Sequence, residues 1–394
     1  MDAAKTRAAR LERTFHGSCI EIRVEASVAK QSKTAVLVGS SVCAAVLTLD
    51  RAHTLNIYAW SDYFPKSLID KFQITSGIHV NLALLDSPGM AEAVLSTGHS
   101  NYDIVTMNAS PELGREIPKG FWRKLDRTRI PDARNADTKI MELLQAVDPG
   151  NQYAIPWMWG TIRMMYNRDK LKSLVPNAPL DSLDLLFKKE WLSKVSECGI
   201  NLLDAWGEVM PMVSRYLGQQ QLSTDPVALA AVVTKLKEIR PFIRRIAFSG
   251  YYEQLADGEL CLSIGYSGDA IIARRMVEEG HTNLHIGYAY AKEIVPFFID
   301  KLVIPADSPN TSSAESFINF VMRPEISAEV TRYIGFATGN AAAMPLLEPS
   351  IRENPVIYPP TSVRDRMTLQ PRYTPEETLV FRESGNSLKQ ICCH

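Results

Sequence analysis

Three short segments of this 394-residue chain, far apart in the sequence, place an aromatic ring within three residues of an acid. They are Trp60-Ser61-Asp62-Tyr63, Tyr266-Ser267-Gly268-Asp269 and Phe298-Ile299-Asp300. Each lies at or near the end of an apolar run that is typical of a β-strand, where a fold can expose the chain to a cleft. An aromatic ring offers its π-face to a cation, and a carboxylate offers charge-assisted hydrogen bonds. Together the three segments predict a site for a small organic cation.

The composition is ordinary for a globular protein, with 46% apolar and 22% charged residues. The length allows two lobes, each with its own core. A formal net charge of −1, without a basic stripe interleaved with aromatic residues, argues against a nucleic-acid partner. No apolar run reaches the roughly 18 residues of a standard transmembrane helix.

Residues 1–49 are predicted to be a leader. Lys30 and Lys33 precede an apolar stretch at 35–49, which is typical of a secretory signal peptide and short for a membrane anchor. The charged residues before Lys30 do not fit a signal, so we expect the true start to lie later, with Val28 as a candidate. Cleavage is expected near Ala45 or a few residues beyond it. The mature protein is therefore predicted to be periplasmic.

Cysteine usage is compatible with export. Cys43 lies in the apolar stretch, but Val42 occupies the position where a lipoprotein needs a small residue, so a lipid anchor is not expected. Outside the leader and the extreme tail only Cys198 and Cys261 remain. This even pair suits one disulfide in an oxidising compartment. Two separate buried thiols are the alternative.

From residue 54 onward the chain alternates strand and helix patterns. We predict strands near 55–59, 78–84, 102–105, 164–167, 260–265 and 297–303, and helices near 65–76, 90–95, 181–197, 208–217, 226–240, 312–322 and 324–334, with a further helix beginning at Ser110-Pro111. The aromatic segment at 153–161 is expected to cross into a second lobe. Alternating strands and helices imply a largely parallel sheet, whose ligand sites lie beyond the carboxyl ends of the strands.

Several short motifs follow one another in a fixed order along most of the chain. They are Asn56-Ile57-Tyr58-Ala59-Trp60-Ser61-Asp62-Tyr63, Asp148-Pro149-Gly150-Asn151, Met158-Trp159-Gly160-Thr161, Cys198-Gly199-Ile200, Asp257-Gly258-Glu259-Leu260-Cys261, Gly265-Tyr266-Ser267-Gly268-Asp269, Ile304-Pro305-Ala306-Asp307 and Ile357-Tyr358-Pro359-Pro360. In this order and spacing the chain resembles the periplasmic spermidine/putrescine-binding proteins of bacterial ABC importers. The resemblance runs from about residue 55 to residue 360, and the tail after about Leu369 departs from it.

The resemblance implies an α/β, two-lobed periplasmic binding protein fold (type II), with a hinge between the lobes and the ligand in the interlobe cleft. Lobe 1 would comprise residues 53–158 and 298–345, and lobe 2 residues 159–297 and 346–394. The resemblance also supports the Cys198–Cys261 disulfide. It implies a protein that binds a polyamine and delivers it to an ABC transporter permease in the inner membrane. We also expect a monomer without a cofactor or metal.

The resemblance further implies a set of ligand-binding residues. The matching positions are Trp60, Ser61, Asp62, Tyr63, Glu208, Asp269, Phe298 and Asp300. Three other pocket positions depart from the family pattern: Asn108 stands where a serine is often found, Tyr266 where a tryptophan is usual, and Phe336 where a tyrosine is typical. The acids all remain, so the preference for a cation is expected to stand, whereas ligand length and affinity are open.

A diamine keeps both ammonium groups charged near pH 7, since a primary alkyl amine resembles lysine with a pKa of about 10.4. We assign Asp269 and Asp300 to one ammonium group, and Glu208 with Asp62 to the other end or to an internal amine. The methylene spacer needs apolar walls, and burying four methylenes contributes roughly 3 kcal/mol. The candidate walls are Trp60, Tyr63, Tyr266, Phe298 and Phe336.

Structural roles remain open for each of these residues. A Trp-x-Asp sequence is more often structural, and an acid at a strand end often caps a helix. Glu208 could be the first-turn acid of the helix near 209–217, where it favours the helix dipole. The rings could belong to the core, and Asn108 and Phe336 are placed by the alignment alone.

Other functions are weaker alternatives. A binding protein for another small cation or amino compound comes second, an enzyme that acts on such a compound through paired carboxylates is a distant third, and a sensor is a further possibility. His281 and His285 are four residues apart, but the nearby glycines indicate a loop and strand, so no metal site is predicted. No phosphate-binding loop and no nucleophile elbow is present in the sequence.

Overall fold

The computed structural model describes residues 11–16, 19–24, 54–61, 63–85, 93–110, 112–280, 283–369 and 373–390. The chain divides into two compact units, Met1–Thr54 and Leu55–His394. In the first unit, β1 (Leu11–His16) and β2 (Cys19–Val24) form an antiparallel hairpin. The stretch predicted to be a signal peptide lies outside the described residues.

The second unit is built on one sheet with the strand order β4-β3-β5-β11-β6-β9-β7-β8. The strands are β3 (Thr54–Trp60), β4 (His79–Leu85), β5 (Ile104–Asn108), β6 (Ala154–Asn167), β7 (Ile200–Leu203), β8 (Arg245–Ala247), β9 (Leu262–Tyr266), β10 (Ile286–Ala289), β11 (Val295–Val303), β12 (Ala337–Thr338) and β13 (Met367–Leu369). The short strands β10 and β12 pair with β6, and β13 pairs with β11.

Parallel and antiparallel pairs are mixed in this sheet. β3 runs parallel to β5, and β7 runs parallel to both β8 and β9. At the centre, β11 is antiparallel to β5 and to β6, and β6 is antiparallel to β9. The expectation of a largely parallel sheet is therefore wrong at the centre, because two long strands cross it in opposite directions.

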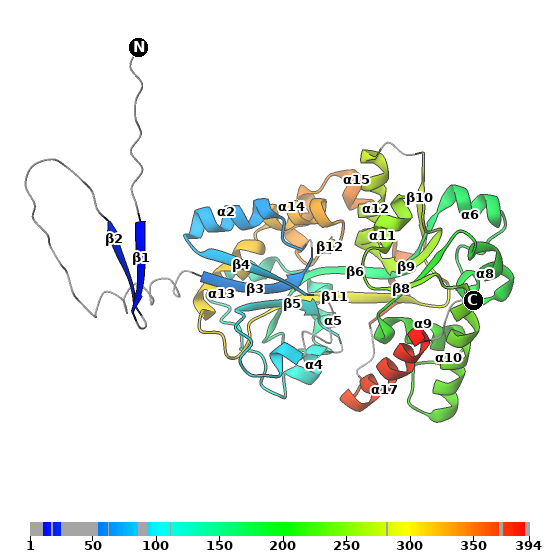
Figure 1. The fold of residues 1–394 in the computed structure, drawn as a ribbon, viewed down its shortest axis with the longest axis horizontal. Coiled ribbons are helices and arrows are strands. Elements are labelled where there is room, and N and C mark those ends of the chain that lie inside the picture. The colour runs from blue at the N-terminus through cyan, green and yellow to red at the C-terminus, as the bar shows by residue number, and fades with distance from the viewer. Residues whose placement is uncertain are drawn as a thin grey trace, which may run out of the picture. The chain divides into compact units, whose positions relative to one another are not determined.

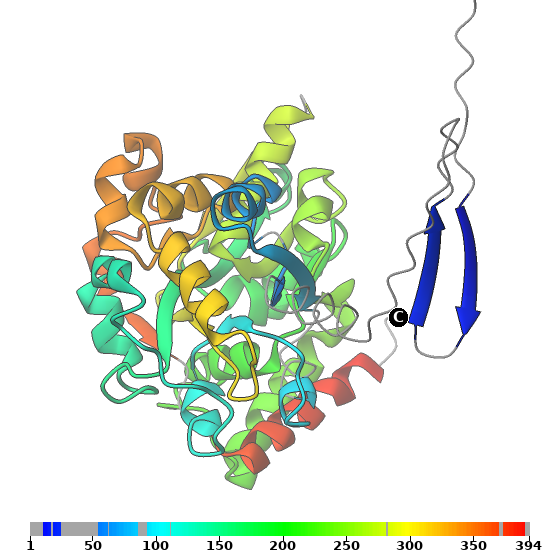
Figure 2. The ribbon, with the colours of Figure 1, turned by 90° about the vertical axis from the view of Figure 1, so that its left-hand side faces the viewer.

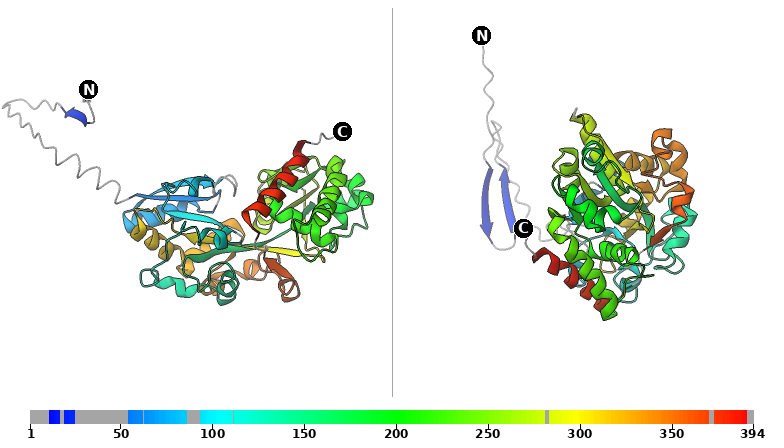
Figure 3. Two further views of the ribbon diagram at one scale, coloured as in Figure 1. Left: turned by 90° about the horizontal axis from the view of Figure 1, so that it is seen from below. Right: turned by 90° about the vertical axis from the view of Figure 1, so that its right-hand side faces the viewer.

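β6 joins two groups of strands: a first strand group of β3, β4 and β5, and a second strand group of β7, β8 and β9. Residues 154–161 of β6 pair with β11, whereas residues 162–166 pair with β9. The predicted crossing segment and the strand after it are thus one continuous element, and every residue of β6 is buried. In Figures 1 and 3, β6 and β11 run from the first strand group toward the second.

Asp148 fixes the turn that leads into β6. Its buried carboxylate accepts the backbone N–H groups of residues 152–154, at 2.9, 2.9 and 3.0 Å. Gly150 and Asn151 have φ values of 77° and 50°, the left-handed region that glycine and asparagine tolerate best. The Asp148-Pro149-Gly150-Asn151 motif is therefore a structural turn.

The helices largely follow the predicted pattern. They are α2 (Lys66–Ser76), α4 (Glu112–Glu116), α5 (Thr138–Leu144), α6 (Arg168–Leu174), α7 (Asp184–Phe187), α8 (Lys189–Val195), α9 (Trp206–Tyr216), α10 (Pro226–Ile239), α11 (Tyr251–Ala256), α12 (Ser267–Glu279), α13 (Thr311–Val321), α14 (Pro324–Ile334), α15 (Pro349–Arg352), α16 (Thr361–Arg364) and α17 (Pro375–Asn386). The segment expected as one helix near 181–197 is two, because Lys188 is extended between α7 and α8. Within the described residues, no helix is long and apolar enough to cross a membrane.

The C-terminal helix α17 packs against α9, beside which it lies in Figures 1 and 2. Thr374 and Glu377 form a capping box at its start. Near its end, the backbone of Gly385 lies against the indole ring of Trp206, where a Cβ would come within 2.2 Å of the ring. The Trp206 indole N–H donates to Oδ1 of Asn386 at 3.1 Å. The tail that departs from the family pattern is thus fixed to α9, the helix that follows β7.

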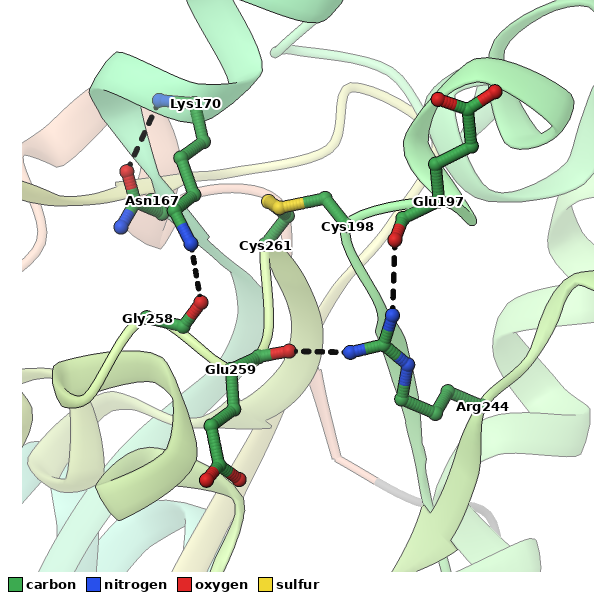
Figure 4. The surroundings of a disulfide bond; sticks show 8 residues. All are labelled: Asn167, Lys170, Glu197, Cys198, Arg244, Gly258, Glu259 and Cys261. Atoms are coloured by element: carbon green, nitrogen blue, oxygen red, sulfur yellow. Dashed lines mark hydrogen bonds between the residues drawn. A yellow bond between two sulfur atoms is a disulfide. The ribbon is translucent and has the colours of Figure 1, made fainter.

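Cys198 and Cys261 form the predicted disulfide, shown in Figure 4. Their Cα atoms are 5.4 Å apart, and the two residues lie just before the parallel strands β7 and β9. Beside the bond, the Arg244 guanidinium donates to the carbonyl oxygens of Glu197 and Glu259 at 2.9 and 2.6 Å. The disulfide and Arg244 together hold the amino ends of these strands side by side.

Replacing both cysteines by serine is expected to lower the free energy of unfolding by about 4 kcal/mol, because the unfolded chain is then no longer closed across a separation of 63 residues. Urea unfolding followed by circular dichroism measures this difference. Dithiothreitol should destabilise the wild type by a similar amount and leave the double serine variant unchanged. Equal stability of the oxidised wild type and the double variant would contradict the contribution assigned to this bond.

Candidate ligand-binding site

One cavity of about 580 Å³ collects most of the residues that the sequence singles out. Ten of the eleven line it: Trp60, Ser61, Tyr63, Asn108, Glu208, Tyr266, Asp269, Phe298, Asp300 and Phe336. Asp62 lies outside the described residues. The volume falls within the range of small-molecule sites in proteins.

The cavity lies where the carboxyl ends of strands from both groups face each other. Trp60 and Asn108 are the last residues of β3 and β5, and Tyr266 is the last residue of β9. Glu208 comes from the first turn of α9, which follows β7, and Asp300 comes from the central strand β11. The rule that ligands bind beyond the carboxyl ends of strands in open α/β sheets explains why these distant segments meet.

Three of the predicted carboxylates lie in the cavity wall, and each accepts a hydrogen bond from a tyrosine hydroxyl. Tyr63 donates to Asp300, which is 3% exposed, and Tyr251 donates to Asp269 in the first turn of α12. Tyr266 donates to Glu208, which is 9% exposed, at 2.8 Å. A phenol orients a carboxylate without neutralising its charge. The three acids therefore still suit a cationic ligand.

Burial raises the pKa of Glu208 to about 8 and the pKa of Asp300 to about 6. The hydrogen bonds from Tyr266 and Tyr63 oppose these shifts, and the charges of Glu112 and Asp300 add to the pKa of Glu208. Without a cation, these carboxyl groups therefore hold protons for part of the time near neutral pH. An ammonium group between them would favour the charged carboxylates.

Six aromatic rings form a continuous chain along the cavity. Successive centroids lie 5.5, 6.0, 5.4, 5.5 and 6.1 Å apart in the order Trp60, Phe248, Tyr266, Phe298, Phe336 and Tyr63. Most neighbours meet edge to face, as aromatic pairs prefer. The rings serve as apolar walls and as π-faces for a cation.

Two glycines make room for this chain of rings. A Cβ on Gly268 would lie 2.6 Å from the ring of Phe336, and a Cβ on Gly160 would lie 2.8 Å from the ring of Phe298. Both distances are far below normal contact. The glycines in the Met158-Trp159-Gly160-Thr161 and Gly265-Tyr266-Ser267-Gly268-Asp269 motifs therefore position the cavity wall.

Asn108 is held from two sides. Its side-chain oxygen accepts the backbone N–H of Ser110 at 3.2 Å, and its carbonyl accepts from the buried ammonium group of Lys301 at 2.9 Å. Lys301 also lies 3.9 Å from the carboxylate of Glu116, and burial lowers the pKa of Lys301. In the sheet, Asn108 is the partner of Asp300 across β5 and β11. Asn108 thus lies next to an acid of the site.

Several residues of the cavity escape the sequence reasoning. They include Glu112, Arg115, Trp206, Phe248 and Tyr252, and, from the C-terminal segment that contains α17, Tyr373, Thr378, Phe381, Arg382, Asn386 and Lys389. Phe248 directly follows β8, whose three residues are too few to show an alternating pattern. Its position after the apolar pair Ile246-Ala247 is the one signal that could have revealed it. Tyr251, the partner of Asp269, gives no signal before the fold is known.

The candidate metal pair is not assembled in the described part of the chain. His285 lies with its Nδ1 atom 2.8 Å from the carboxylate of Asp169, and His281 lies outside the described residues. Among those residues, no group of three His, Cys, Asp or Glu side chains is arranged to hold a metal ion.

The fold and this cavity agree with the family that the chain matches. Residues 67–357 match the model of the bacterial extracellular solute-binding protein family, and the chain belongs to that family. Members of this family are binding components of transport systems and not enzymes. The chain is therefore a solute-binding protein.

Named relatives cover most of the chain. It is 39% identical over 336 residues to the putrescine-binding periplasmic protein SpuD of Pseudomonas aeruginosa, covering 85% of this chain and 91% of the relative. It is 36% identical over 316 residues to the putrescine-binding periplasmic protein PotF of Escherichia coli, covering 80% and 85%. The solved structure of the spermidine/putrescine substrate-binding protein PotD of Streptococcus pneumoniae matches with a TM-score of 0.69 and 26% identity, over 86% of this chain and 98% of that one. The predicted periplasmic binding protein fold is confirmed.

A cationic ligand is expected to bind more tightly as the pH rises from about 6 to about 8, because the raised pKa values of Glu208 and Asp300 mean that protons must leave before both carboxylates can pair. A primary amine stays charged throughout this range. Calorimetry at pH 7 in buffers of different ionisation enthalpy should show proton release on binding, and Glu208→Gln should reduce it. Proton uptake, or an affinity independent of pH, would contradict this assignment.

Proposed function

We propose that this chain is an exported solute-binding protein that captures putrescine, spermidine or a related polyamine and delivers it to an ABC transporter permease in the inner membrane. One observation supports this most: carboxylates from α9, α12 and β11 meet in one cavity that is lined by a continuous chain of aromatic rings. The names of the relatives agree with it, since SpuD and PotF are described as putrescine-binding periplasmic proteins.

In this proposal Asp269 and Asp300 bind one ammonium group. Burial raises the pKa of the Tyr63 hydroxyl most, and the charges of Asp300, Asp269 and Glu208 raise it further. These effects indicate that the three acids lie near this phenol. Glu208, with Asp62, would take the other end of the ligand or an internal amine. The methylene groups would lie along the rings between them. The distance between the acids would then select ligand length, because a mismatched amine leaves a buried carboxylate unpaired.

Two aromatic residues of the cavity, Tyr266 and Phe336, differ from the family pattern and affect which ligand the site selects. Tyr266 places a hydroxyl donor on Glu208, and Phe336 has no hydroxyl and packs its ring against Gly268 and Tyr63. These changes leave room for a second candidate, a binding protein for another small cation or amino compound. The acids Glu208, Asp269 and Asp300 in the wall favour the polyamine.

Binding would close two lobes about β6 and β11. We assign residues 53–158 and 298–345 to lobe 1, and residues 159–297 and 346–394 to lobe 2. Leu347 and Ile351 pack with Ala328 of α14, which favours extending lobe 1 somewhat beyond residue 345. A ligand that touches both lobes only when they are closed shifts the population toward the closed form, which the permease would recognise.

The remaining assignments concern where the protein acts and in what form. We propose that it works in the periplasm as a monomer, exported by its leader and without a lipid anchor. The relatives are described as periplasmic, and the Cys198–Cys261 disulfide suits an oxidising compartment.

Isothermal titration with putrescine, spermidine, cadaverine and agmatine tests the proposed function. Asp269→Asn should weaken amine binding by about 10-fold to 100-fold, because a hydrogen bond to a charged group contributes about 1.5–3 kcal/mol. Asp169→Asn is the matched control, since Asp169 pairs with His285 and does not line the cavity. Mass spectrometry should recover the amine unchanged. The proposal fails if no amine gives binding heat, and Asp269 leaves the site if its variant binds as the wild type does.

Tyr266→Trp should change the preference among these amines more than it changes stability, because it replaces the hydroxyl that donates to Glu208 by a larger ring. The ratio of putrescine to spermidine affinity measures the effect, and thermal unfolding provides the control. An unchanged ratio would show that Tyr266 does not form a wall for the ligand.

A further inference from the structure

The cavity extends beyond the acids and rings predicted from the sequence. Its additional wall comes from α4 and from the C-terminal segment that ends in α17, through Glu112, Arg115, Tyr373, Thr378 and Phe381. Arg115 joins the two elements, because its Nη1 donates to the hydroxyl of Thr378 at 2.8 Å. This part of the cavity is called the outer end here.

Glu112 brings a further carboxylate to the cavity, at its outer end. Its side chain is 18% exposed, and Oε1 lies 4.0 Å from Nη2 of Arg115, which is longer than a hydrogen bond. The other oxygen, Oε2, is buried and has no hydrogen-bond partner among the described residues. Burial raises the pKa of Glu112 to about 7, although the charges of Lys301 and Arg115 oppose the shift. A buried carboxylate oxygen without a donor is costly, so this position calls for one.

Tyr373 brings a second polar group to the same end. The residue is 6% exposed, and its hydroxyl is buried without a hydrogen-bond partner among the described residues. Its ring packs edge to face on Phe381, with the centroids 4.9 Å apart. Buried hydroxyl groups in proteins are normally paired. The empty hydrogen-bonding position of Tyr373 therefore also calls for a partner in the cavity.

Another acid of the cavity wall near α17 already has a protein partner. Asp204 pairs with the ammonium group of Lys389 at 2.6 Å. Glu112, in contrast, acts on the site through its charge, which raises the pKa of Glu208. The charges of Glu112 and Asp300 thus both act on Glu208 in the cavity.

We propose that Glu112 and Tyr373 form an additional subsite for a protonated nitrogen, so that the cavity takes a triamine in preference to a diamine. This rests on the proposed function, that the protein binds polyamines. The nitrogen donates a hydrogen to Oε2 of Glu112, and the Tyr373 hydroxyl, which lines the same cavity, accepts a further hydrogen bond from the ligand. A diamine held by Asp300, Asp269 and Glu208 leaves both groups unpaired, whereas a third amine satisfies them.

The experiment compares putrescine with spermidine by isothermal titration in the full-length protein. Glu112→Gln keeps the shape of the side chain and removes the charge. It should weaken spermidine binding by about 10-fold or more and putrescine binding by less than about 3-fold, since only the third nitrogen reaches Glu112. Tyr373→Phe removes only a neutral hydroxyl, so it should weaken spermidine by roughly 3-fold to 10-fold. The control is Glu190→Gln, an exposed acid in the first turn of α8.

The outcomes separate this inference from the function on which it rests. Unchanged spermidine affinity in both variants, or an equal loss of affinity for the two amines, contradicts the subsite. The proposed function still stands in that case if the wild-type protein binds the amines. If the wild type binds neither amine, the proposed function itself fails. Should Glu112→Gln prove unfolded by thermal scan, Tyr373→Phe decides alone, and a selective loss of spermidine supports the subsite.

Discussion

The burial of several carboxylates in one cavity is the constraint on which the whole site depends. Asp300, Asp269 and Glu208 lie in its wall, and each accepts a hydrogen bond from a tyrosine hydroxyl, which orients a carboxylate but leaves its charge in place. Burial accordingly raises the pKa of Glu208 and Asp300. A positively charged guest relieves this cost, so the site gains most when an organic cation enters.

The sheet makes this concentration of charge possible. β6 and β11 cross its centre in opposite directions, and the parallel strands on either side end at the same cavity. Gly160 and Gly268 then let the rings of Phe298 and Phe336 approach the backbone. The acids are thus positioned by β11 and by the first turns of α9 and α12, which restricts the positions that the carboxylates can take.

The sequence predicts most helices, the disulfide and the main site segments better than it predicts strand directions and the roles of single side chains. The aromatic and acidic segments, the disulfide and most helices are readable because each has a local pattern or a family motif. The direction of β11 against β6 has no such signature, since alternation looks the same in parallel and antiparallel strands. Phe248 follows a strand of three residues, Tyr251 acts through a carboxylate 18 positions away, and Glu112 looks like an ordinary first-turn acid. The roles of these three residues depend on contacts that form only in the folded protein.

The placement of the tryptophans has a practical consequence. Of the six in the chain, Trp60 and Trp206 line the cavity, Trp122, Trp157 and Trp159 are buried elsewhere in the core, and Trp191 is half-buried in α8. Aliphatic amines do not absorb at the wavelengths where indole absorbs. A bound amine would therefore change the surroundings of two native fluorophores without contributing fluorescence itself. The protein thus carries a built-in optical reporter of occupancy, and no dye has to be attached near the cavity.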